Sequence, residues 1–147
     1  MASRQVHVDL GAYGSRSALA RRLEGNLRPA AGIRANIVAL AGFMRILKEP
    51  VLTEFAGRLL NIHPSLLPKF PGLGAWRQAL EAGDSESGCT VHLVDAGIDS
   101  GEILAQARVP ILPGDTAESL HARIQEQEHR LFPKVIGDFG ARLKAAQ

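Results

Sequence analysis

Two short apolar runs constrain the fold of this chain more than any other feature. They are Asn36–Ala41, which is bounded by Gly42, and Arg58–Ile62. A strand that is covered on both faces loses the apolar–polar alternation of a half-exposed strand, which is typical of parallel sheets between layers of helices. A segment with helical features precedes each run. We therefore predict an α/β fold with a mostly parallel sheet and helices on both faces.

Further strands and helices extend this alternation along the chain. Ser15 can cap a helix whose leucines recur every four residues, and Pro50 suits the first turn of another helix. The other expected elements are strands at Val6–Leu10, Cys89–Val94 and Ile103–Ile111 and helices at Glu49–Phe55 and Ala75–Ala82.

The last third of the chain predicts a hairpin followed by a helix. The connection Asp95–Gly101 is rich in turn residues, so we expect its two flanking strands to pair antiparallel as a late portion of the sheet. Asp115 and Glu118 have the spacing of a capping box, which predicts a helix that continues through Arg130. Pro133 is expected to start or kink a final segment.

Composition sets limits on function. The chain has 147 residues, of which 46% are apolar and 22% charged, as expected of one globular domain. No apolar run reaches the roughly 20 residues of a membrane span, and a net charge of +2 with scattered basic residues does not predict nucleic-acid binding. The only cysteine is Cys89, which excludes an internal disulfide and fits a reducing, cytoplasmic location.

Two polar residues stand where the second apolar run opens into a loop. Asn61 and His63 are two residues apart, so in a strand their side chains share a face, and the loop His63–Gly74 that follows is unusually long. A carboxamide and an imidazole can donate hydrogen bonds to a developing oxyanion, and the imidazole can also move a proton. Spacing alone leaves open that Asn61 starts a turn and that His63 is a loop histidine.

Other candidate residues are ambiguous when taken alone. Asp99 precedes Ser-Gly, where an aspartate is usually a turn residue. His92 lies within a predicted strand and is assigned a structural or pocket-lining role. No histidine has a metal-ligand spacing to cysteine or carboxylates, so no metal is expected.

Several stretches of the chain together resemble the phosphoribosylglycinamide formyltransferase family, which is also called glycinamide ribonucleotide transformylase. The most specific stretch is Asn61-Ile-His-Pro-Ser-Leu-Leu-Pro68, which the family shares with its formyltetrahydrofolate hydrolase relatives. The stretches that favour the transformylase are Gly42–Leu47 and Gln125–His129, and the resemblance also covers Val91–Val94 and Asp99–Gly101.

The resemblance implies a reaction and assigns catalytic residues. A formyl group would pass from 10-formyltetrahydrofolate, a co-substrate, to the amine of glycinamide ribonucleotide in purine (IMP) biosynthesis. Asn61 and His63 would stabilise the tetrahedral oxyanion, and Asp99 would orient or charge His63 and assist removal of the amine proton. No metal and no covalent intermediate is implied.

The resemblance also implies binding residues. The folate would contact Met44, Arg45, Ile46, Leu47, Val94 and Ile98. The ribonucleotide would contact Pro64, Ser65, Gln125 and Glu128.

Two departures from the family pattern bear on activity. The family opens with a strand and a glycine-rich loop that cradles the substrate phosphate, whereas residues 7–16 resemble its third strand and the helix after it. We therefore expect residues 1–147 to form a single formyltransferase catalytic domain that is incomplete at its N-terminus. Histidines that often follow the glycine at position 72 are also absent. Two alternatives stay open: a formyltetrahydrofolate hydrolase, and an inactive truncated homologue that retains folate binding.

The same expectation predicts self-association. Without the opening strands, an apolar sheet edge at Asn36–Ala41 or Val6–Leu10 would be exposed, and such edges pair readily with other chains. We expect light scattering at high protein concentration to show species larger than a monomer. A clean monomer would contradict this expectation.

Overall fold

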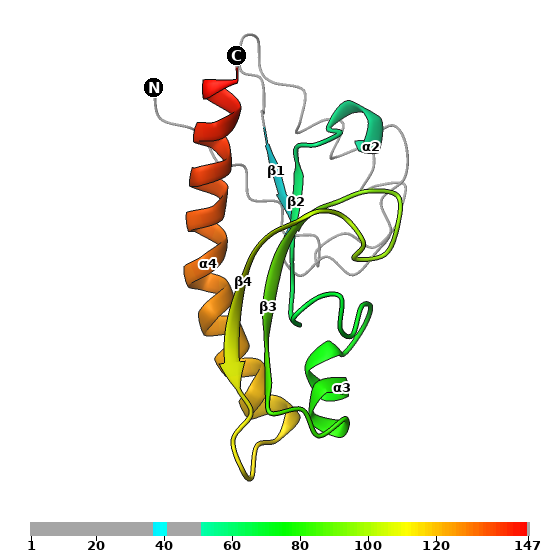
Figure 1. The fold of residues 1–147 in the computed structure, drawn as a ribbon, viewed down its shortest axis with the longest axis vertical. Helices are drawn as coiled ribbons and strands as arrows, with labels where there is room; N and C mark the ends of the chain where they lie inside the picture. The colour runs from blue at the N-terminus through cyan, green and yellow to red at the C-terminus, as the bar shows by residue number, and fades with distance from the viewer. Residues whose placement is uncertain (1–36, 41–50, 147) are drawn as a thin grey trace, which may run out of the picture.

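The computed structural model describes residues 37–40 and 51–146, which form a mixed sheet flanked by helices (Figure 1). The described strands are β1 (Val38–Leu40), β2 (Leu59–His63), β3 (Glu86–Leu93) and β4 (Ile103–Pro110), and the helices are α2 (Val51–Glu54), α3 (Ala75–Glu81) and α4 (Ala117–Ala145). The strand expected at Val6–Leu10 and the helix expected from Ser15 lie outside the described residues.

The sheet has the order β1-β2-β3-β4, with β1 parallel to β2 and the other two pairings antiparallel. The α/β class and the late antiparallel hairpin are confirmed. The sheet was predicted to be mostly parallel, whereas two of the three pairings among the described strands are antiparallel. Two neighbouring parallel strands must be joined by a crossover of a dozen or more residues, usually along a sheet face. Residues 94–102, which connect β3 to β4, are too few for such a crossover, so these two strands pair antiparallel. Figure 1 shows α3 at the lower end of the sheet, so β3 starts there and runs back along β2.

All five residues of β2 are buried, which confirms the second apolar run as an internal strand. Because side chains alternate along a strand, Leu60 and Ile62 face one side of the sheet, while Asn61 and His63 face the other. The first pair belongs to the apolar core between the sheet and α4. The remaining members of that core are Cys89, Val91, Val109, Leu120, Ile124, Phe132, Val135 and Phe139.

Helix α4 is longer than predicted. It continues past Arg130 and through Pro133 to Ala145, so the expected new segment at Pro133 is wrong. A proline inside a helix loses one backbone hydrogen bond and crowds the preceding turn. Phe132, Val135 and Phe139 recur on one face and are each only 8% exposed, so apolar burial on both sides of the proline holds the helix together.

The capping box that opens α4 is shifted by one residue from the predicted pair. The Ser119 backbone N–H donates to Thr116 Oγ1 at 3.1 Å, and the Thr116 N–H donates back to Ser119 Oγ at 2.9 Å. Asp115 is occupied elsewhere, since its carboxylate accepts hydrogen bonds from Leu112 N–H and from the Arg123 guanidinium. The hydrogen bond from Arg123 holds the pKa of Asp115 below its ordinary value.

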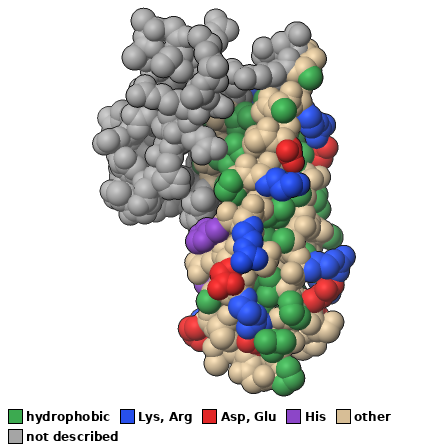
Figure 2. Space-filling model, turned by 90° about the vertical axis from the view of Figure 1, so that its left-hand side faces the viewer, with side chains coloured by type: hydrophobic (Ala, Val, Ile, Leu, Met, Phe, Trp, Pro, Cys, Tyr) green, Lys and Arg blue, Asp and Glu red, His purple; other side chains and the backbone are tan. Residues whose placement is uncertain are grey.

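The surface around α4 carries charges of both signs. Figure 2 shows Lys and Arg side chains interspersed with Asp and Glu over this face, without a large area of one sign. One of the pairs is Lys134 with Asp138, one turn apart on α4. No helix in the described part of the chain is long and apolar enough to cross a membrane.

The shifted box makes a stability prediction. Thr116→Ala removes the cap of α4 and should lower the free energy of unfolding by about 1 kcal/mol. Glu118→Ala, at the position first predicted to close the box, should have a clearly smaller effect, whereas Gln could still close such a box. Chemical denaturation of the two variants beside the wild type measures both. A larger loss for Glu118→Ala than for Thr116→Ala would show that the predicted register was right.

Candidate active site

The structure brings the three predicted catalytic residues together on the face of the sheet opposite the core. Asn61 and His63 lie in β2 and are 7% and 3% exposed, and Asp99 comes from the connection between β3 and β4. His63 Nδ1 lies 3.4 Å from Asp99 Oδ2. A carboxylate that is 13% exposed in its side chain requires such partners, because burying an unpaired charge is costly.

A second buried histidine completes the cluster. His92 in β3 is paired with Asn61 across the two strands, and it is only 2% exposed. Its Nε2 lies 3.5 Å from Asp99 Oδ1 and 3.5 Å from Asn61 Nδ2. The Asp99 carboxylate therefore lies between two imidazoles. The sequence placed His92 in a strand but did not show that it adjoins Asn61 and Asp99.

The acceptors around the histidines assign the positions of their protons. His63 Nε2 lies 2.9 Å from the Phe70 carbonyl, which can only accept, so this nitrogen carries a proton. The contact of His63 Nδ1 with the Asp99 carboxylate is attractive only when Nδ1 carries a proton. His92 Nδ1 donates to Leu93 O at 2.9 Å, and in the neutral ring Nε2 is then free to accept from Asn61.

The loop after β2 supplies the backbone groups of this site. The Gly72 N–H donates to Asp99 Oδ2 at 2.8 Å. Phe70, Gly72 and Asp99 all have positive φ, at 52°, 87° and 50°, which is unfavourable for the two residues that carry side chains. Strained backbone is therefore concentrated where it touches His63 and Asp99. Gly72 thus gives Asp99 a hydrogen bond, although the histidines that often follow this glycine in the family are absent.

One buried polar atom in the cluster lacks a partner. Asn61 Oδ1 accepts no hydrogen bond from any described residue, although the side chain is buried. A buried carbonyl oxygen without a donor costs about 1–3 kcal/mol. A ligand with an N–H or O–H group would satisfy it.

The other residues expected to bind substrate are placed less uniformly. Ser65 is fully buried, and its hydroxyl donates to Lys69 O at 2.6 Å. Its N–H donates to His63 O and its carbonyl accepts from the Thr90 hydroxyl, so only a second lone pair of that carbonyl oxygen is left for a substrate. Val94 is half-buried beside β2, where its N–H donates to Leu59 O, and Ile98 is 56% exposed next to Asp99. The half-buried Pro64 directly follows His63. The expected folate contacts Met44, Arg45, Ile46 and Leu47 lie outside the described residues.

Gln125 and Glu128 are not hydrogen-bonded to Asn61, His63, His92 or Asp99 in the described structure. Gln125 is exposed on α4, whereas Glu128 is half-buried. Burial raises the pKa of Glu128 to about 7. Burial also raises the pKa of the Cys89 thiol to about 12, with a further contribution from the charge of Glu128, so Glu128 lies near the core face of β3.

Two further observations concern ligands. In the described ranges, no group of three or more His, Cys, Asp or Glu side chains is placed to hold a metal ion.

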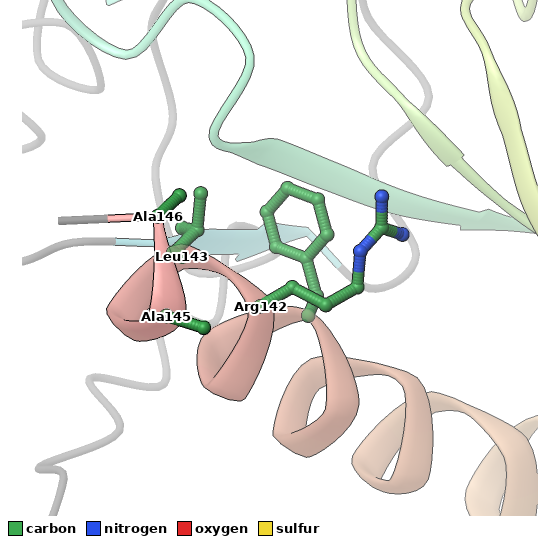
Figure 3. Close-up of a pocket in the computed structure, with 5 residues that line it drawn as sticks. Arg142, Leu143, Ala145 and Ala146 are labelled. Carbon is green, nitrogen blue, oxygen red and sulfur yellow. The ribbon is translucent and has the colours of Figure 1, made fainter.

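A cavity of about 460 Å³ lies at the C-terminal end of α4 (Figure 3). Its lining residues, none of which was predicted to be part of the site, are Phe139, Arg142, Leu143, Ala145 and Ala146.

Comparison with known proteins gives one consistent result. Residues 5–136 match the model of the formyl transferase family. The chain is 54% identical over 110 residues to phosphoribosylglycinamide formyltransferase of Escherichia coli, which covers 74% of this chain and 52% of the relative. It is 53% identical over 124 residues to the trifunctional purine biosynthetic protein adenosine-3 of Drosophila melanogaster, covering 84% of this chain and 9% of that protein.

A solved structure shows the same similarity. Glycinamide ribonucleotide transformylase 1 from Symbiobacterium toebii superposes with a TM-score of 0.72 at 53% identity, over 88% of this chain and 60% of that one. The chain thus spans about half the length of the bacterial relative and about a tenth of the trifunctional one.

The raised pKa of Glu128 predicts how stability depends on pH. The folded state binds this proton more tightly than the unfolded state, whose carboxyl has the ordinary pKa of 4.5. The resulting stabilisation is fully present below pH 4.5 and is lost as the pH rises to about 7. We expect the free energy of unfolding of Glu128→Gln, measured by denaturation across this range, to decline less than that of the wild type. Parallel pH profiles would contradict the assignment.

Proposed function

Because the chain belongs to the formyl transferase family, we propose that it transfers a formyl group from 10-formyltetrahydrofolate to the amine of glycinamide ribonucleotide, a step of purine biosynthesis. The names of its relatives support this choice of substrates. The observation that carries the proposal is the cluster in which Asp99 lies between His63 and His92 beside Asn61.

The first chemical step is attack of the amine on the formyl carbon, which places negative charge on the formyl oxygen. Asn61 Nδ2 has only a long contact of 3.5 Å to His92, so it is available to donate to this oxygen. Loss of one such donor typically lowers the rate by about 10²–10³-fold. The unpartnered Asn61 Oδ1 can accept an N–H of the attacking amine, which would orient its lone pair toward the formyl carbon.

The second step breaks the bond between the formyl carbon and N10 and requires proton movement. The amine loses one proton, and N10 of the folate gains one as it leaves. As an imidazolium, His63 can donate its Nδ1–H to the oxyanion. Its Nδ1 lies 3.4 Å from Asp99, which is longer than the 2.9 Å contact between its Nε2 and Phe70 O, so Nδ1 is the nitrogen that can turn to a new acceptor. Asp99, directly or through an ordered water, would receive the amine proton and pass it to N10 as the carbon–nitrogen bond breaks, which regenerates the carboxylate.

The binding residues are assigned in the same proposal. The folate would contact Met44–Leu47, Val94 and Ile98. The ribonucleotide would contact Pro64, the Ser65 backbone, Gln125 and Glu128. With its pKa raised to about 7, the Glu128 carboxyl can donate to a ribose hydroxyl as well as accept from one.

The location and assembly of the protein are also proposed. A cytoplasmic location fits purine biosynthesis and the single buried thiol, Cys89. Self-association would use β1, the terminal strand of the described sheet. Glycinamide ribonucleotide and the folate would be the other partners, and no nucleic-acid or membrane partner is proposed.

Transfer of labelled formyl from 10-formyltetrahydrofolate to glycinamide ribonucleotide tests the proposal. Asp99→Asn keeps the size of the side chain but removes its charge, and it should lower kcat on the order of 10²-fold or more. Asp138→Asn, at an exposed carboxylate of α4, is the matched control and should leave kcat unchanged.

The same assay separates the two alternatives. Release of formate without transfer to the amine would instead identify a formyltetrahydrofolate hydrolase. Absence of both activities, with a folate analogue still raising the melting temperature, would identify a binding homologue.

A further inference from the structure

A polar network on the same face of the sheet as Asn61 and His63 connects β4 to His63. It begins at Gln106 in β4, passes through Thr90 in β3, and reaches the loop that follows β2. Among its side chains, only that of Ser65 was assigned a role from the sequence, and that role is substrate binding.

Thr90 is the centre of this network. Its side chain is fully buried, and its hydroxyl donates to Ser65 O at 2.7 Å. The same oxygen accepts from Leu67 N–H at 3.1 Å and from Gln106 Nε2 at 3.0 Å. A hydroxyl has one proton and two lone pairs, so all of its hydrogen-bonding capacity is used.

Gln106 connects the same loop to the edge of the described sheet. Its carboxamide donates to Leu67 O at 2.9 Å as well as to Thr90 Oγ1. The Leu66 side chain packs directly over Gly88 of β3, where an added Cβ would lie 2.8 Å from Leu66 Cδ2. Residues 65–67 are therefore held against β3 and β4 by both polar and apolar contacts.

The network continues along the loop to the catalytic histidine. Ser65 Oγ donates to Lys69 O at 2.6 Å and lies 3.5 Å from Phe70 O. Phe70 adopts a strained φ of 52°, and its carbonyl accepts from His63 Nε2. A strained residue keeps its conformation only when the surrounding structure holds it, and here the contacts of residues 65–69 do so.

We propose that Thr90 and Gln106 are positioning residues that act on His63 through this loop, an inference that rests on the proposed function. By fixing the Phe70 carbonyl, they keep a proton on His63 Nε2 and so direct Nδ1 toward Asp99. Neither residue contacts the reacting atoms. Their effect is to select one orientation and one protonation pattern of the imidazole.

Four variants of the full 147-residue chain test this proposal. Thr90→Val removes the hydroxyl while keeping the shape, and Thr90→Ser keeps the hydroxyl. Gln106→Leu removes the carboxamide from a side chain that is largely exposed, so it tests the same link with less risk to folding. Arg108→Gln, at a neighbouring β4 side chain that pairs with Glu86 outside the network, is the matched control.

The first readout is ¹⁵N-edited NMR of labelled histidine, with the His63 signal assigned from its loss in His63→Gln. We expect a slowly exchanging Nε2–H signal in the wild type, Thr90→Ser and Arg108→Gln, and its loss in Thr90→Val and Gln106→Leu. In the formyl-transfer assay, the latter two should lose up to about 100-fold in kcat, as a misplaced catalytic group can cause. The KM for the folate should change little.

Two outcomes overturn the proposal, and one concerns only the proposed function. Retention of the His63 signal and of wild-type kcat in folded Thr90→Val or Gln106→Leu overturns it. An equal loss in Thr90→Ser also does, because the hydroxyl would then not be the active feature. If the wild type transfers no formyl group, the proposed function fails, while the NMR comparison still decides whether these residues position His63.

Discussion

The site depends on the burial of one carboxylate. The carboxylate oxygens of Asp99 lie 3.4 Å from His63 Nδ1 and 3.5 Å from His92 Nε2, and one of them accepts a hydrogen bond from the Gly72 N–H. A buried charge is tolerated only when it is paired and hydrogen-bonded. The contacts of Asp99 with His63 Nδ1 and with the Gly72 N–H meet this requirement.

The structure separates the rigid support from the strained site. Residues 60 and 62 of β2 face the core beneath α4, and the intervening Asn61 and the following His63 are thereby held on the opposite face. The strain occurs in the connections, at Phe70 and Asp99, where the backbone must present a carbonyl and a carboxylate to the same imidazole. Strain of this kind is common where a loop on a stable scaffold performs the chemistry.

The sequence predicted the parts of this arrangement that local patterns determine. The continuous apolar run in the sequence identified β2, and the alternation of side chains along a strand placed Asn61 and His63 on one face. Asp99 was added to the site only by the family resemblance. His92 was missed because the register between β2 and β3 is set by their packing, and a shift of one residue would reverse its face. The cap of α4 was misplaced because Asp115 and Thr116 are both favourable capping residues, and Arg123 decides between them by binding Asp115.

A crystal structure with a tetrahedral ligand tests the central claim most directly. A folate analogue with an electrophilic ketone in place of the formyl group adds water and mimics the tetrahedral intermediate. We expect one oxygen of the hydrated centre to lie about 2.7–3.1 Å from Asn61 Nδ2 and from His63 Nδ1, with the other oxygen toward Asp99. A ligand bound with its tetrahedral centre away from these three side chains would contradict it.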